Sequence, residues 1–94
     1  MTSEQDRIQG WSLEEGVKYE VAQDVLMQLI AIAGRQIRQL EDQPEPDQAE
    51  IAQWQERRST WIRRRHELLP TDAEANQQVL DEDGQILRAL QDAE

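Results

Sequence analysis

The chain has 94 residues, with 20 acidic against 10 basic side chains and a formal net charge of -10 at pH 7. A chain of this length forms one small domain and buries only about 60–65% of the surface that its unfolded form exposes. Self-association is a common way for such a thin core to gain buried area. The excess of acid repels phosphate, so nucleic-acid binding would need a segregated basic face.

The sequence carries no pattern for export or for membrane insertion. Cysteine is absent, which excludes disulfides and thiolate metal sites. The first ten residues lack the basic start and apolar run of a signal peptide, and the longest apolar stretch, 25–33, has about half of the ~20 residues that a membrane span needs. We expect a cytoplasmic protein, with a flexible N-terminal arm over 1–11 and a single helical domain over 12–94.

Three segments begin with a capping residue that is followed three positions later by a glutamate. In this arrangement the cap side chain accepts a hydrogen bond from a free backbone N–H, and the glutamate reaches back to the N–H of the cap. The three predicted caps are Ser12, Asp47 and Thr71. Each cap precedes a periodic apolar segment, so the pattern predicts three helix starts.

Prolines indicate where the helices end. Pro44 and Pro46 interrupt the first helix, and Pro70 ends the second. We therefore predict an all-α, antiparallel three-helix bundle, with helices over about 12–41, 47–69 and 71–92. The weak point is the sequence DEDG at 81–84, where Asp-Gly could split the third helix.

The helix over 12–41 is apolar over more of its circumference than two neighbouring helices would cover. A monomeric bundle would leave part of this apolar surface in contact with water. We therefore expect a homodimer through this helix. The residues predicted for the dimer face are Val21, Val25, Met27, Ala31 and Ile32.

The second helix contains the repeat WQERRSTWIRRR, in which Trp54 and Trp61 lie at the centre of the apolar arc beside Arg58 and Arg65. The third helix likewise has Asn76 and Asp83 within its apolar arc. If the two helices pack antiparallel across a tight turn, facing residues have numbers that add to about 141.

This register pairs Arg58 with Asp83 and Arg65 with Asn76, and we predict that both pairs are internal polar locks. It also favours cation–π contacts of Trp54 with Arg58 and of Trp61 with Arg65.

The first two helices form a hairpin whose facing numbers add to about 88. This register places Gly34 opposite Trp54 and Arg64 near Asp24.

The remaining basic residues of the second helix are candidates for binding a partner: Arg57, Arg63, Arg64 and His66. Arginines can contact phosphates and tryptophans can stack on bases. We favour a core role for the tryptophans, because they head an apolar arc. His66 is the single histidine, and no metal, cofactor or nucleophilic motif accompanies it.

We expect a non-enzymatic protein–protein interaction module, such as a small acidic adaptor, regulator or inhibitor that acts through helix faces. The first alternative is a nucleic-acid-binding module that uses the basic side of the second helix. The second alternative is a small all-helical enzyme with a dimer-cleft site for an anionic ligand. The cations considered for that site are Lys18, Arg35, Arg57 and Arg64.

Overall fold

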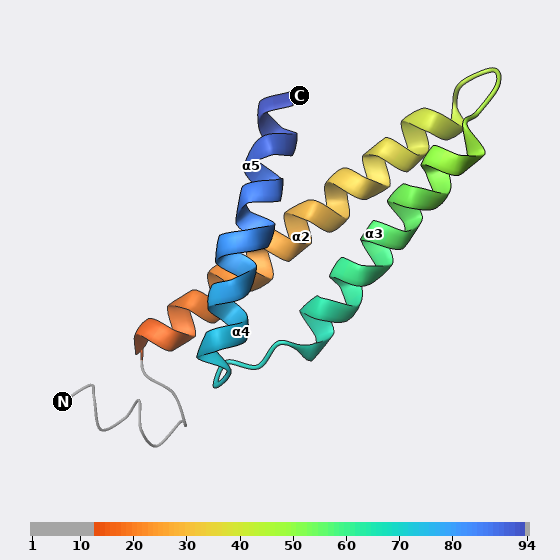
Figure 1. Cartoon of the computed structure of the whole chain (residues 1–94). Helices are drawn as coiled ribbons and strands as arrows, with labels where there is room; N and C mark the ends of the chain where they lie inside the picture. The colour runs from red at the N-terminus through yellow and green to blue at the C-terminus, as the bar shows by residue number, and fades with distance from the viewer. Residues whose placement is uncertain (1–12, 94) are drawn as a thin grey trace.

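The computed structural model describes residues 13–93, which form helices joined by short connections (Figure 1). The elements are α2 (Leu13–Glu41), α3 (Gln48–Glu67), α4 (Ala73–Gln78), η1 (Val79–Asp83) and α5 (Gly84–Ala93). None of the described residues forms a strand, so the predicted all-α class is confirmed. The predicted arm over 1–11 and the Ser12 cap lie outside the described residues. No described helix is both long and apolar enough to cross a membrane.

Two helix starts show side-chain caps. Asp47 Oδ1 accepts a hydrogen bond from the Glu50 N–H at 3.1 Å, as predicted. The predicted Thr71 cap is wrong, because Asp72 Oδ1 accepts from the Ala75 N–H at 3.0 Å. The Asp72 N–H donates to the Leu69 carbonyl oxygen and closes a turn before the helix, so the cap position falls on Asp72 rather than on Thr71.

The elements α4, η1 and α5 follow one another without a connection, and we call them the third segment (73–93). η1 is a single widened π-helical turn, in which the Gly84 N–H donates to the Val79 carbonyl oxygen. Gly84 itself has helical dihedral angles, with φ -60° and ψ -39°. The DEDG sequence therefore widens the helix and does not break it.

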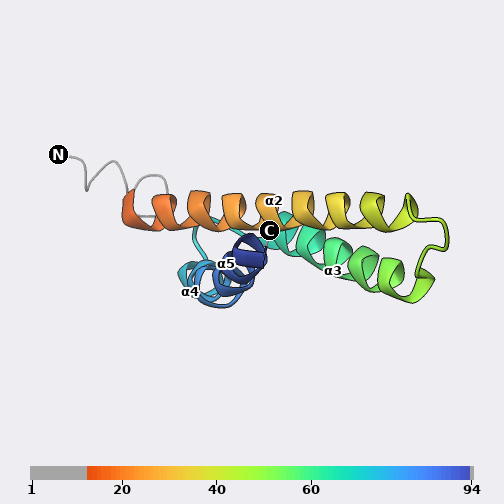
Figure 2. The ribbon, with the colours of Figure 1, turned by 90° about the horizontal axis from the view of Figure 1, so that it is seen from above.

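Both α3 and the third segment pack on the same side of α2 (Figure 2). α3 and the third segment make little backbone contact with each other, and their axes diverge in Figure 1. The close antiparallel packing predicted between 47–69 and 71–92 is therefore wrong. The physical reason is the connection: α3 ends at Glu67, Leu68 is extended, and the next helix begins only at Ala73, so the connection is longer than predicted and does not hold the two helices side by side.

The register of α2 against α3 agrees with the prediction. Gln23 Nε2 donates to the Arg65 carbonyl oxygen at 2.9 Å, as the predicted hairpin register requires. Its finer contacts differ, because a Cβ on Gly34 would lie 4.0 Å from the guanidinium of Arg58 and not against Trp54.

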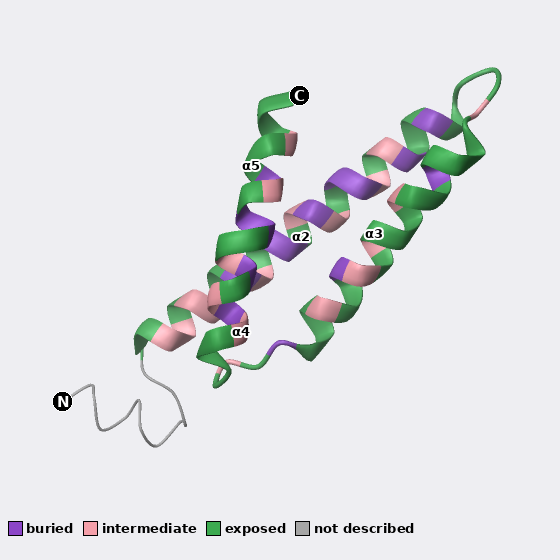
Figure 3. Ribbon diagram, viewed as in Figure 1, coloured by how far each residue is buried: buried purple, intermediate pink, exposed green. Residues whose placement is uncertain are grey.

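The core follows the inner face of α2, as the buried positions in Figure 3 show. Its main cluster contains the buried residues Ala22, Val25, Leu26, Leu29, Ile32, Ala33, Trp61, Leu68, Val79 and Leu87. A smaller cluster near the α2–α3 loop contains Ile37, Leu40 and Ile51. The half-buried indole of Trp54 packs against both clusters and joins them.

Candidate protein-binding surfaces

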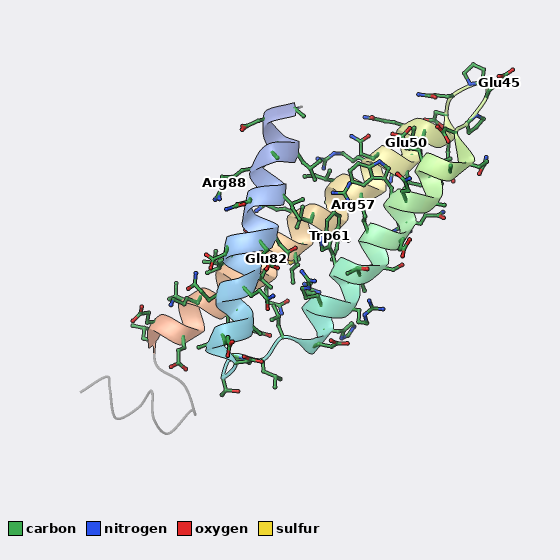
Figure 4. All side chains as sticks on the ribbon, viewed as in Figure 1. Glu45, Glu50, Arg57, Trp61, Glu82 and Arg88 are labelled. Carbon is green, nitrogen blue, oxygen red and sulfur yellow. The ribbon has the colours of Figure 1, made fainter. Side chains whose placement is uncertain are left out.

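A cleft of about 540 Å³ lies between α3 and the third segment, where the two diverge. Figure 4 shows Arg57 and Trp61 on the α3 side and Glu82 on the opposite helix. The cleft is lined by Gln53, Glu56, Arg57, Thr60, Trp61, Arg64, Glu82, Asp83 and Ile86. Its walls thus combine aromatic, cationic and acidic side chains.

The polar lock predicted for Asp83 exists, but its partner is Arg64. Arg64 Nη1 donates to Asp83 Oδ2 at 2.6 Å, and the Asp83 side chain is only 3% exposed. The predicted pair of Arg58 with Asp83 is therefore wrong. The third segment meets α3 more than one helical turn closer to the C-terminus of α3 than the predicted register requires. Arg58 instead lies beside Gly34 of α2.

Arg57 contributes both cation–π contacts of α3. Its guanidinium lies 4.4 Å from the ring centroid of Trp54 and 5.2 Å from that of Trp61. The predicted contacts of Trp54 with Arg58 and of Trp61 with Arg65 are wrong. A signal was present in the sequence, since Arg57 is three residues after one tryptophan and four before the other, so its side chain can reach both.

Asn76 is fully buried, and its role is to fix the connection before the third segment. Its Nδ2 donates to the Leu69 carbonyl oxygen at 3.0 Å, and its Oδ1 has no hydrogen-bond partner among the described residues. The predicted lock with Arg65 is wrong, because Arg65 is exposed and lies on the α2 side of α3.

The four basic residues predicted for partner binding do not form one surface. Arg57 and Arg64 line the cleft, where indoles and a carboxylate hold them. His66 lines a separate groove against α2, and Arg63 is exposed. Nothing in this distribution provides the continuous basic stripe that would track a phosphate backbone.

The outer face of α2, opposite α3 and the third segment, carries several exposed apolar side chains. Leu13, Val17, Val21 and Met27 are 65%, 51%, 46% and 49% exposed. With Ala31, also exposed, they lie on one side of α2 when successive residues are placed 100° apart.

The predicted dimer face is therefore partly wrong. Val21, Met27 and Ala31 are exposed as expected. Val25 and Ile32, at 9% and 3% exposure, belong to the core, because α2 also carries the third segment.

A shallow groove of about 340 Å³ borders this outer face on the α3 side. Ile62 of α3, 42% exposed, meets Met27 and Ala31 of α2 there. The complete lining is Met27, Ile30, Ala31, Ile62, Arg65 and His66. Apolar surface from two helices is thus continuous across the edge of the hairpin.

The cations considered for an anionic ligand do not converge within one chain. Lys18 lies 4.0 Å from Glu14 near the start of α2, and Arg35 is about 25 Å further along the same helix. Within 13–93, no group of three or more histidine, aspartate or glutamate side chains is arranged to hold a metal ion.

Comparison with known proteins found no match to a protein-family model, a curated protein or a solved structure.

Proposed function

We propose that this chain is a non-enzymatic protein–protein interaction module, a small acidic adaptor, regulator or inhibitor that acts through helix faces. The observation that carries the proposal is the bare outer face of α2. All other described helices pack on the opposite side, so several apolar residues along this helix remain exposed (Figure 2). Several exposed apolar side chains on one face of a helix favour an interaction site there.

The charge distribution fits a protein contact better than a nucleic-acid contact. Both tryptophans of α3 pack against the core clusters, and Trp61 is only 4% exposed, so neither can serve as an open platform for bases. The net charge of -10 opposes binding to phosphate. The absence of cysteine supports a cytoplasmic location for the module.

The cleft is the second contact surface in this proposal. It presents the guanidinium of Arg57, which is stacked on the indoles of α3, and the apolar side chain of Ile86, while Trp61 is buried beneath them in the core. Aromatic and arginine side chains are enriched among residues that dominate binding energy. A partner side chain could contact Arg57 and Ile86 without displacing the Arg64–Asp83 pair.

The test is crosslinking capture from the native host with wild-type chain, Met27→Glu and a matched control, Ala52→Glu. Both variants add one carboxylate at an exposed position, but Ala52 lies on α3 away from the outer face of α2. We expect proteins that are captured by the wild type and by Ala52→Glu to be lost with Met27→Glu, because a buried, unpaired charge disfavours an apolar contact. Salt-sensitive recovery of nucleic acid without a specific protein would contradict the proposal.

A further inference from the structure

We infer that the outer face of α2 binds a second copy of this chain, antiparallel, with a two-fold axis near residue 29. This inference rests on the proposed role of that face and names its occupant. Three observations carry it: the exposed apolar residues at the middle of α2, the opposite charges on its two halves, and the continuity of this surface with the groove at Ile62.

The charges on the outer face are segregated along α2. Glu20 and Asp24 are exposed in the N-terminal half, whereas Arg35 and Arg38 are exposed in the C-terminal half. All four lie on the same side of the helix as Met27 and Ala31. A face with acid at one end and base at the other complements itself when a copy is rotated by 180°.

The charges also select the register. When facing residues have numbers that add to about 58 or 59, Glu20 meets Arg38 of the second copy and Asp24 meets Arg35. In a parallel pair each charged residue would face the same residue of the second copy. An antiparallel pair centred near residue 22 would bring Glu20 against Asp24. Like charges that face each other disfavour both arrangements.

The centre of the inferred interface is apolar. Met27 and Ala31 face each other across the two-fold axis, and the groove beside them is lined by Ile30 and Ile62. The side chain of Met27 from each copy can enter the groove of the other, because methionine is flexible and fits irregular surfaces. Charged pairs then form the rim around this apolar centre, which is the usual anatomy of a specific interface.

Among residues 13–93, no other helix lies on the outer side of α2. α3 and the third segment lie together on the inner side of α2, so two copies can approach through their outer faces (Figure 2). The cleft remains open in each copy of the dimer and faces away from the two-fold axis.

The test exploits the absence of cysteine, since one introduced cysteine can be coupled only to another copy. Ala31→Cys and Val21→Cys, both at exposed positions, are treated with a bis-maleimide no longer than one helix–helix spacing. In the inferred dimer the two copies of residue 31 are separated along the helix axis by roughly 5 Å, and the two copies of residue 21 by roughly 25 Å. We expect covalent dimer as the major product for Ala31→Cys and only background for Val21→Cys.

Ala52→Cys on the exposed side of α3 is the control for random collisions. Coupling at both 31 and 21 would show a parallel pair, coupling at 21 alone would show the shifted register, and either result overturns the inference. Coupling at neither position also overturns it. If neither cysteine is coupled but Met27→Glu still abolishes the capture of another protein, the proposed function stands without the dimer. If Ala31→Cys is coupled but no captured protein is lost with Met27→Glu, the dimer stands and the proposed function is overturned.

Discussion

Two arginines of α3 are held in the same cleft by different forces. Arg57 is held by the faces of two indoles, and Arg64 is held by the carboxylate of Asp83. The two partners of the ion pair differ in environment, since the Arg64 side chain is 41% exposed while that of Asp83 is 3% exposed. The loss of one partner therefore does not have the same consequence as the loss of the other.

We predict that Arg64→Met is more destabilising than Asp83→Leu. Removing Arg64 leaves a buried carboxylate without its partner, which costs about 3 kcal/mol. Removing Asp83 leaves a guanidinium that water can still reach, so the cost is about 1 kcal/mol. Urea unfolding of both variants gives the two free energies.

The double variant Arg64→Met/Asp83→Leu recovers much of the stability, because both charges are replaced by apolar groups. The matched cycle of Arg58→Met with Asp83→Leu is additive, since Arg58 makes no ion pair with Asp83. Equal interaction free energies in the two double-mutant cycles would show that Asp83 has no preferred partner.

At this scale the sequence predicted the environment of Asp83 but not its partner. An aspartate within an apolar arc needs an opposite charge whichever way the helices pack, so its internal pairing was predictable. The partner depends on the register of two helices, and the register depends on a connection whose conformation the sequence did not specify. The i, i+4 spacing predicted Arg58 and Arg65 as the cation–π partners, whereas Arg57 contacts both indoles because its spacing to them is i, i+3 and i, i+4.

At the scale of elements, helix starts and ends were predicted to within about two residues, as is usual for helix boundaries. Asp47 caps α3 as expected, whereas TDAE at 71–74 contains two adjacent residues that can cap. Periodicity could not distinguish them, because the choice is made by the turn between Leu69 and Asp72. The π turn at Val79–Asp83 was not predicted; the Asp-Gly pair at its end was the only signal of irregularity.

We predict that Gly84→Ala stabilises the chain by about 0.5–1 kcal/mol. Gly84 has helical dihedral angles, and a Cβ there would lie 4.0 Å from both Arg88 Nη1 and the Val79 carbonyl oxygen, which is ordinary van der Waals contact. Alanine lowers the conformational entropy of the unfolded chain at no steric cost. Thermal unfolding beside Gly34→Ala, a second helical glycine with space for a Cβ, provides the comparison. A lower melting temperature for Gly84→Ala alone would show that the π turn requires glycine.

At the scale of the whole molecule, α2 is the central element on which the other described helices pack. The sequence predicted its length and its excess of apolar surface, because both follow from periodicity. It did not predict that this excess divides into two parts. Val25 and Ile32 are covered by the core, while Val21, Met27 and Ala31 remain exposed. This division depends on the direction of the third segment, which no local pattern specifies.

Sedimentation equilibrium of the wild-type chain beside Met27→Glu and Ala52→Glu tests the central claim most directly, namely that the outer face of α2 is a protein-contact surface occupied by a second copy. We predict a mass of twice the 11.0 kDa chain for the wild type and for Ala52→Glu. Met27→Glu should sediment as a single chain with unchanged helix content, because its carboxylate would be buried at the two-fold axis. A wild-type chain that sediments as a monomer at every concentration, or a Met27→Glu chain that stays dimeric, would contradict this account.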